Sequence, residues 1–179
     1  MSTRGYMGIK KKGQLKGLYN HCDSYISGLG KDIIEALNNI PKSERINKLN
    51  EVYDNITLVN ESDTPTQELI DYAIENGLYD GSVSNRSTKD MYCLFRNCQG
   101  RLDMYLNGLK YMLNGNDFLN NELFCEYAYI INLDTNTLDI CTCGNHLQLS
   151  VDLLNLNYND IANAMKEYYN SHREIFKVK

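Results

Sequence analysis

The sequence contains no tryptophan and only two prolines among its 179 residues, and it has neither a low-complexity block nor an internal repeat. No apolar run approaches the roughly 18 residues that a membrane-spanning helix needs, so no membrane span is expected. The first residues lack the apolar core of a signal peptide, which predicts a cytoplasmic protein. Lysine and arginine number 18 against 23 acidic residues, and the net charge of -5 argues against a protein that binds nucleic acid directly.

The chain also lacks the short motifs of several large enzyme classes. It has no phosphate-binding P-loop, no dinucleotide-binding glycine pattern, no zinc-protease motif and no nucleophile elbow. The sequence therefore predicts no cofactor, and it favours a protein that is not an enzyme over one that is.

The apolar content is sufficient for one folded domain. Hydrophobic residues make up 42% of the chain and the mean hydropathy is -0.47, values typical of a globular protein. A chain of this length normally buries about 70% of its unfolded surface, which is enough for a core without disulfides or metals. We therefore expect residues 1–179 to form a single domain.

Two β-hairpins are predicted from the alternation of apolar and polar side chains on either side of a turn. The first turn is Lys12-Gly13, where glycine adopts a positive φ without steric cost, and the second begins at Asp134 in an Asx-rich stretch. The four predicted strands comprise residues 4–12, 14–25, 126–133 and 137–142.

Apolar residues at helical spacing predict several helices that pack on these strands. Residues 80–88 form a polar loop between two of the helices, and this loop is a candidate interaction surface. Together the elements predict an α+β fold, in which an antiparallel sheet built from two β-hairpins has several helices packed on it. The predicted helices comprise residues 31–37, 43–53, 65–76, 88–98, 101–113 and 159–169.

The six cysteines are expected to be thiols, most of them buried, because the predicted compartment is reducing. Cys125, Cys141, Cys143 and His146 could instead supply four zinc ligands. Structural zinc sites, however, usually separate paired cysteines by two or more residues, whereas here one residue separates two cysteines that share a face of a predicted strand. This spacing favours buried thiols and no metal site.

Polar residues gather where the second predicted strand ends, just before a Gly-Leu-Gly turn. Strand alternation places His21 and Asp23 on one face, with Cys22 and Ser24 on the other. A His–Asp pair on one face can act as a base and its orienting group, whereas a hydrogen-bonded histidine at a strand end is the simpler structural interpretation. The turn at Gly28–Gly30 leads into a helix and could bind an anion through free N–H groups.

The N-terminus offers a second arrangement that could carry chemistry. Ser2 is small, so removal of Met1 would expose an amine and a hydroxyl on one residue, as in enzymes whose N-terminal nucleophile uses its own amine as the base. The alternative is that Ser2 and Thr3 are simply the entry to the first strand.

Several of these residues resemble an uncharacterised family found in phages, bacteria and their mobile elements. Members of that family open with a small residue followed by Thr-Arg, and their first hairpin ends in a Trp-Asp-Gly-Tyr-Pro stretch. This chain has Ser2-Thr3-Arg4 at its start and Cys22-Asp23-Ser24-Tyr25-Ile26 after its hairpin, with further similarity over residues 91–100 and 124–134. The resemblance implies a phage or mobile-element context.

The positions that match the family pattern are candidate ligand-binding or partner-binding residues. They are Thr3, Arg4, Asp23 and Tyr25, to which we add His21 for its chemistry. Cys22 stands where the pattern has tryptophan, and this indicates a residue that packs rather than one that attacks a substrate.

The leading functional hypothesis is a non-enzymatic phage or mobile-element protein that binds and inhibits a host defence complex, as anti-CRISPR proteins do. The negative charge of the chain favours a host protein complex with a basic surface that normally holds nucleic acid.

Two alternatives remain open. One is an amide hydrolase in which Ser2 or Thr3 attacks with help from Asp23, Arg4 or His21. The other is a binding protein for a small phosphorylated ligand, held by Arg4 and the glycine turn.

Overall fold

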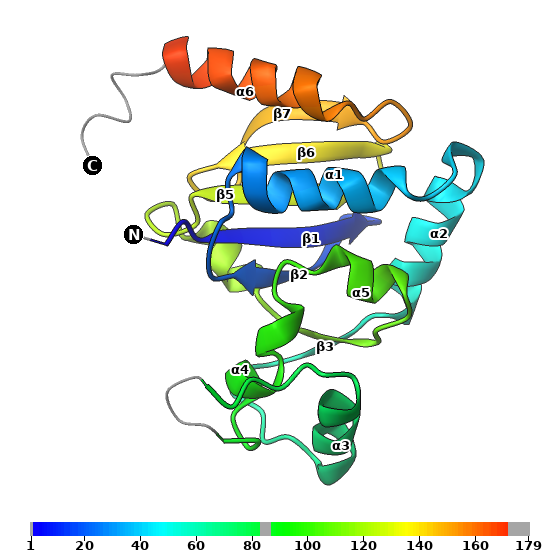
Figure 1. Cartoon of the computed structure of the whole chain (residues 1–179), viewed down its shortest axis with the longest axis vertical. Helices are drawn as coiled ribbons and strands as arrows, with labels where there is room; N and C mark the ends of the chain where they lie inside the picture. The colour runs from blue at the N-terminus through cyan, green and yellow to red at the C-terminus, as the bar shows by residue number, and fades with distance from the viewer. Residues whose placement is uncertain (1, 83–86, 172–179) are drawn as a thin grey trace.

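The structure, a computed structural model, describes residues 2–82 and 87–171 and has a five-stranded sheet at its centre. The strands of this sheet are β1 (Gly5–Lys11), β2 (Gln14–Asn20), β5 (Tyr127–Asn132), β6 (Thr137–Thr142) and β7 (His146–Asp152). They lie in the order β2-β1-β5-β6-β7 (Figure 1). β1 and β5 run parallel, and the other neighbouring pairs are antiparallel.

The α+β class is confirmed, whereas the prediction of an antiparallel sheet built from two hairpins is wrong. Both hairpins form, but β1 of the first lies beside β5 of the second and runs parallel to it, so the sheet is mixed. β7 is a fifth strand that was not predicted. Side-chain alternation defines a strand but not the direction of its neighbour, and a parallel pair needs a long crossover that no local pattern reports.

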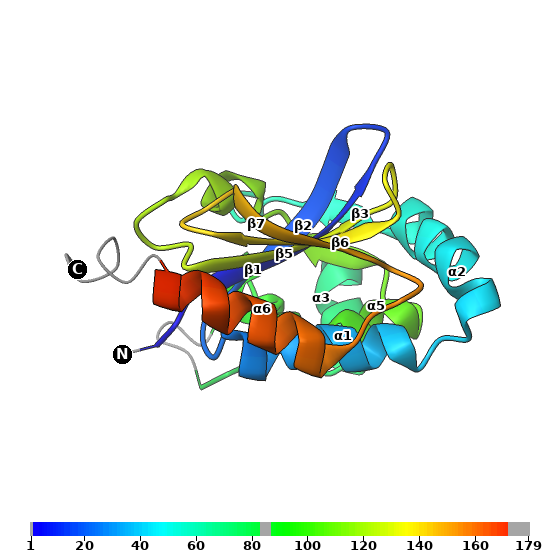
Figure 2. The same cartoon turned by 90° about the horizontal axis from the view of Figure 1, so that it is seen from above.

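Helices cover one face of this sheet. α1 (Lys31–Asn38) and α6 (Tyr158–Ser171) lie on the same side of it, and α2 (Lys42–Asn55) follows α1 (Figures 1 and 2). The π-helical turn η1 (Ile26–Gly30) leads from the first hairpin into α1. The apolar stripes of these helices enter the main core, in which the strands place Met7, Ile9, Leu18, Tyr129, Ile131, Leu138 and Ile140.

The opposite face of the sheet is built around Tyr6. A Cβ on Gly8 or Gly17 would come within 2.8 Å or 2.0 Å of the Tyr6 side chain, so both strand positions have room only for hydrogen. The Tyr6 hydroxyl donates at 2.7 Å to Asn116 Oδ1, in the 3-10 helix η3 (Asn116–Asn120), and so holds η3 against the sheet. The other buried members of this smaller core are Leu119, Cys125, Ala128 and Cys141.

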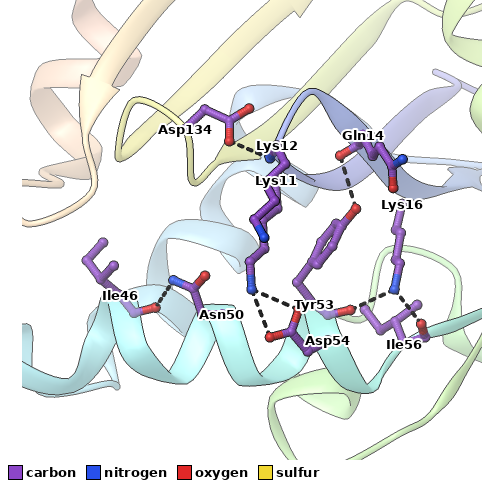
Figure 3. Close-up of polar contacts among 10 residues, drawn as sticks. All are labelled: Lys11, Lys12, Gln14, Lys16, Ile46, Asn50, Tyr53, Asp54, Ile56 and Asp134. Atoms are coloured by element: carbon purple, nitrogen blue, oxygen red, sulfur yellow. Dashed lines mark hydrogen bonds and ion pairs between the residues drawn. The ribbon is translucent and has the colours of Figure 1, made fainter.

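The β1–β2 hairpin is anchored to the C-terminal end of α2 (Figure 3). Lys16 Nζ donates to the carbonyl oxygens of Tyr53 and Ile56 at 2.9 Å and 2.7 Å, where the helix dipole concentrates negative charge. Lys11 Nζ lies 2.8 Å from the Asp54 carboxylate. These two lysines therefore fix the position of the hairpin against α2.

A second, two-stranded parallel sheet lies beyond the edge strand β2 (Figure 1). In it β3 (Thr57–Val59) pairs with β4 (Tyr111–Leu113), and Gly115 N donates at 2.8 Å to Gly17 O, which joins this layer to β2. The chain between the two strands forms α3 (Gln67–Glu75), α4 (Met91–Leu94), the 3-10 helix η2 (Arg96–Cys98) and α5 (Leu102–Leu106).

The helix predicted over residues 101–113 is wrong beyond its first turns. α5 ends at Leu106, and Gly108 follows with a φ of 103°, a conformation that ends the helix. The apolar residues after it fit both helical and strand spacing, and here they pair with β3 as β4.

Two further expectations concern the polar loop at residues 80–88 and the absence of a membrane span. Of the predicted polar loop at 80–88, residues 83–86 lie outside the described residues. Within residues 2–82 and 87–171, no helix is both long enough and apolar enough to cross a membrane.

Candidate functional site

A cavity of about 580 Å³ opens beside β2, at the junction with the β3–β4 layer. Its size is that of a site for a small metabolite. Its buried lining residues are Leu18, Phe95 and Leu113. Its half-buried lining residues include Arg4, Tyr19, Tyr92, Gln99 and Phe118, and its exposed polar rim consists of Asn60, Glu61, Ser62, Asn114 and Asp117.

Backbone contacts bring the walls of this cavity together. Asn114 N donates to Val59 O at 2.8 Å, and Gly115 N donates to Gly17 O at the same distance. A Cβ on Gly115 would lie 2.5 Å from Tyr19 N, so only glycine lets this segment approach β2 so closely. The cavity is therefore a consequence of how the second layer joins the edge of the main sheet.

Arg4 places an unpaired positive charge in the cavity wall. Its backbone N–H donates to a carboxylate oxygen of Glu126 at 3.2 Å, which fixes the main chain at the start of β1. Its guanidinium lies 5.2 Å from the centre of the Phe124 ring. No hydrogen bond or ion pair joins this guanidinium to any residue that the structure describes, so its donors are available to a ligand.

Arg96 adds a second guanidinium next to the cavity. It donates a hydrogen bond to Gln99 Oε1 and lies 5.6 Å from the centre of the Tyr92 ring, and both of these partners line the cavity. Arg96 is not among the site residues predicted from the sequence. The one sequence signal for it is its place in the 91–100 segment, over which the family resemblance continues.

The surroundings of His21 disfavour its protonated form. Burial, Arg96 and Arg4 each lower its pKa below the ordinary 6.5, in that order of size. Its Nδ1 lies 2.8 Å from the Tyr19 hydroxyl, whose own pKa is raised, chiefly by burial. Since the unfolded chain takes up a proton on His21 more readily than the folded chain, this residue lowers the stability of the fold as the pH falls below 6.5.

We expect replacement of Arg96 by methionine to raise the pKa of His21, because one of the two positive charges that oppose its protonation is removed. An NMR titration of the imidazole signals measures this pKa, and the chain has three histidines to distinguish. Arg101→Met removes a guanidinium that pairs with Asp103 instead, so it should leave the His21 pKa unchanged. A His21 pKa that is the same in both variants and the unmodified protein would contradict this arrangement of charges.

The structure brings only two of the five predicted site residues to the cavity. Arg4 lines it, and His21 contacts its wall through Tyr19. Tyr25 is 42% exposed and lines a separate cavity of about 300 Å³, beside Tyr127 and α6. The hydrogen-bond partner of the His21 ring is Tyr19, so the structure does not pair His21 with Asp23 as base and orienting group.

Thr3 and Asp23 act through their backbone atoms. Thr3 is buried, and its carbonyl accepts a hydrogen bond from Ser24 N at 3.2 Å. Asp23 has a φ of 54°, and its carbonyl accepts a hydrogen bond from Leu29 N at 2.9 Å. Both residues therefore shape the turn between β2 and α1.

Ser24 and Asn20 hold this turn in place and were not selected from the sequence. Asn20 Nδ2 donates to Ser24 Oγ at 2.8 Å, and Tyr129 Oη donates to Ser24 O at 2.9 Å. Both residues are buried: Asn20 is 7% exposed and Ser24 is 0% exposed. Serine and asparagine at a strand end are equally typical of an exposed turn, so residue type alone did not mark them.

The Gly28–Gly30 turn is not open for an anion. Gly28 N and Gly30 N both donate to Tyr25 O at 3.1 Å, and Leu29 N donates to Asp23 O. All three N–H groups therefore already have acceptors, and Arg4 is the part of the predicted phosphate site that remains available.

Two of the three cysteines considered as zinc ligands are buried thiols, whereas Cys143 is half-buried and follows the end of β6 with a φ of 49°. Cys125 and Cys141 are buried, and burial raises the pKa of each to about 12. His146 is exposed and lies 3.2 Å from Glu122. Among the described residues, no three or more histidine, cysteine or acidic side chains are grouped so that they could hold a metal ion.

No protein-family model matches this chain, and neither the curated proteins nor the solved structures contain a significant match to it. The resemblance to the phage and bacterial family therefore stays a prediction.

Proposed function

We propose that this chain is a binding protein for a small phosphorylated molecule, which occupies the cavity beside β2. The observation that carries the proposal is the guanidinium of Arg4, which lines a cavity of about 580 Å³ without a hydrogen-bonding or ionic partner among the described residues. Arginine presents paired N–H donors that match two oxygens of a phosphate.

The surroundings of Arg4 strengthen its attraction for an anion. Its side chain is half-buried, and charges interact more strongly there than in bulk water. Arg96, which contacts the lining residues Tyr92 and Gln99, adds a second positive charge next to the cavity.

Calorimetric titration with inorganic phosphate and with ribose 5-phosphate tests the proposal. Arg4→Met should weaken binding of both at least about tenfold, since a hydrogen bond to a charged group contributes about 1.5–3 kcal/mol. Arg4→Lys keeps the charge but not the paired donors, so its affinity should be intermediate.

Arg101→Met is the matched control, because it removes an arginine that pairs with Asp103 and does not line the cavity. It should bind as the unmodified protein does. If no phosphorylated compound binds, or if Arg4→Met binds them unchanged while its melting temperature shows it to be folded, the proposal is wrong.

The hypotheses of a host-defence inhibitor and of an amide hydrolase stay predictions. For the hydrolase, Ser2 Oγ donates to His21 O at 2.6 Å, and this bond would have to break before the hydroxyl could attack. The cavity favours the third hypothesis, a small phosphorylated ligand, because an arginine without a partner among the described residues lines it.

A further inference from the structure

We infer that the ligand is a nucleoside monophosphate, with its base against the aromatic wall of the cavity and its phosphate at Arg4. The inference rests on the proposed function, because it names the class of phosphorylated molecule that the same cavity binds. It accounts for three features that a phosphate alone leaves unexplained: the aromatic wall, the acidic rim and the number of positive charges.

The aromatic wall favours a planar ring system. Tyr19, Tyr92, Phe95 and Phe118 all line the cavity. The rings of Tyr19 and Phe118 meet edge to face with their centres 4.7 Å apart, which leaves ring surface for a further partner. A nucleobase would cover apolar and aromatic surface that a sugar phosphate, polar on every side, would leave in contact with water.

The acidic rim determines how the ligand is oriented in the cavity. Glu61 and Asp117 carry carboxylates at the exposed rim, and Asn114 Nδ2 donates to Asn60 Oδ1 at 3.2 Å between the two β3–β4 ends. Carboxylates repel a phosphate, whereas they accept hydrogen bonds from ribose hydroxyls and from the amino groups of a base. The phosphate is therefore expected at Arg4 and the hydroxyl or amino groups at the rim.

The charges match one phosphate group. Arg4 lines the cavity, and Arg96 contacts its lining residues Tyr92 and Gln99, so two positive charges lie at or next to it. A phosphate monoester carries up to two negative charges at neutral pH. The described lining residues add two carboxylates and no third cation, so the extra charges of a triphosphate would meet repulsion.

Calorimetric titration of the full chain with the four ribonucleoside 5′-monophosphates, ribose 5-phosphate, adenosine and ATP tests the inference. At least one monophosphate should bind about tenfold or more tightly than ribose 5-phosphate and adenosine, and more tightly than ATP. If ribose 5-phosphate binds as tightly as every nucleotide, the inference is wrong while the proposed function stands. If no phosphate compound binds, both are wrong. Tighter binding of ATP than of AMP would overturn the charge argument.

Two variants of Tyr92 measure the contribution of the base to binding separately from that of the phosphate. Tyr92→Leu should weaken binding of the preferred monophosphate about tenfold through loss of the ring, and Tyr92→Phe, which keeps the ring, should bind within about twofold of the unmodified protein. Binding of ribose 5-phosphate should change little in either variant. Equal losses for the monophosphate and for ribose 5-phosphate in Tyr92→Leu would mean that Tyr92 acts only by supporting Arg96, which would overturn the placement of the base.

Discussion

Replacing Arg45 with alanine should lower the free energy of unfolding by about 3 kcal/mol or more. Arg45 is 2% exposed, and its guanidinium donates to Leu153 O and, at 3.1 Å, to Ile40 O. It therefore ties the N-terminal turn of α2 to the end of α1 and to the β7–α6 connection. Alanine would leave two carbonyl groups without their donors and a cavity where the side chain was.

Chemical denaturation followed by circular dichroism measures this loss as a shift of the transition midpoint. Lys42→Ala is the matched control, because it truncates an exposed cation at the start of the same helix, and it should change the midpoint little. Arg45→Met keeps the apolar stem without the donors, so it should recover only part of the loss, even though an apolar side chain avoids the cost of burying a charge. Equal midpoints for Arg45→Ala and Lys42→Ala would refute the role given to the guanidinium.

The sequence predicts what is local in this fold and misses what is long-range. The apolar stripes of α1, α2 and α6 and the alternation in both hairpins place these elements to within a few residues, because each pattern is contained in one segment. The exception is the second strand, predicted over residues 14–25: β2 ends at Asn20, and Asp23 has a φ of 54°, which no strand adopts. The pairing of Met7 with Tyr129 joins β1 to β5, and that of Leu58 with Met112 joins β3 to β4. No pattern within a segment specifies such partners, because the whole chain packs to decide them.

The candidate site likewise combines residues that local sequence features predict with residues that only long-range packing brings together. Arg4 was predicted because it matches the family pattern, and His21 because a histidine at a strand end carries recognisable chemistry. Tyr92 and Asp117 reach the cavity from segments far apart in the sequence, α4 and η3, so their proximity depends on how these segments pack against β2. Tyr25 was predicted because it matches the family pattern, yet the structure places it at a separate cavity beside Tyr127 and α6.

Replacing Gly28 with alanine should lower the free energy of unfolding by about 3 kcal/mol, the upper end of the usual cost of forcing an extra group into a filled site. A Cβ on Gly28 would lie 2.1 Å from the carbonyl oxygen of Asp23, which is backbone and cannot rotate away. That oxygen accepts the hydrogen bond from Leu29 N, so the turn would have to open to make room. Ser27→Ala changes an exposed neighbour in the same turn without adding an atom near Asp23, and it should leave the denaturation midpoint close to that of the unmodified protein.

The effect of Gly28→Ala should extend to the cavity, because the turn continues directly from the strand end that carries His21. Ser24 follows Asp23 and bonds to Asn20, Thr3 and Tyr129, so a displaced turn pulls on the last residues of β2 and on the entry to β1. Under conditions in which Gly28→Ala is still folded, we expect the NMR signals of His21 to shift and the binding of ribose 5-phosphate to weaken, whereas Ser27→Ala should alter neither. An unstable variant with unchanged His21 signals would show that the turn stabilises the fold without positioning the site, and the position of His21 would then depend on its contacts with Tyr19 and Ser2.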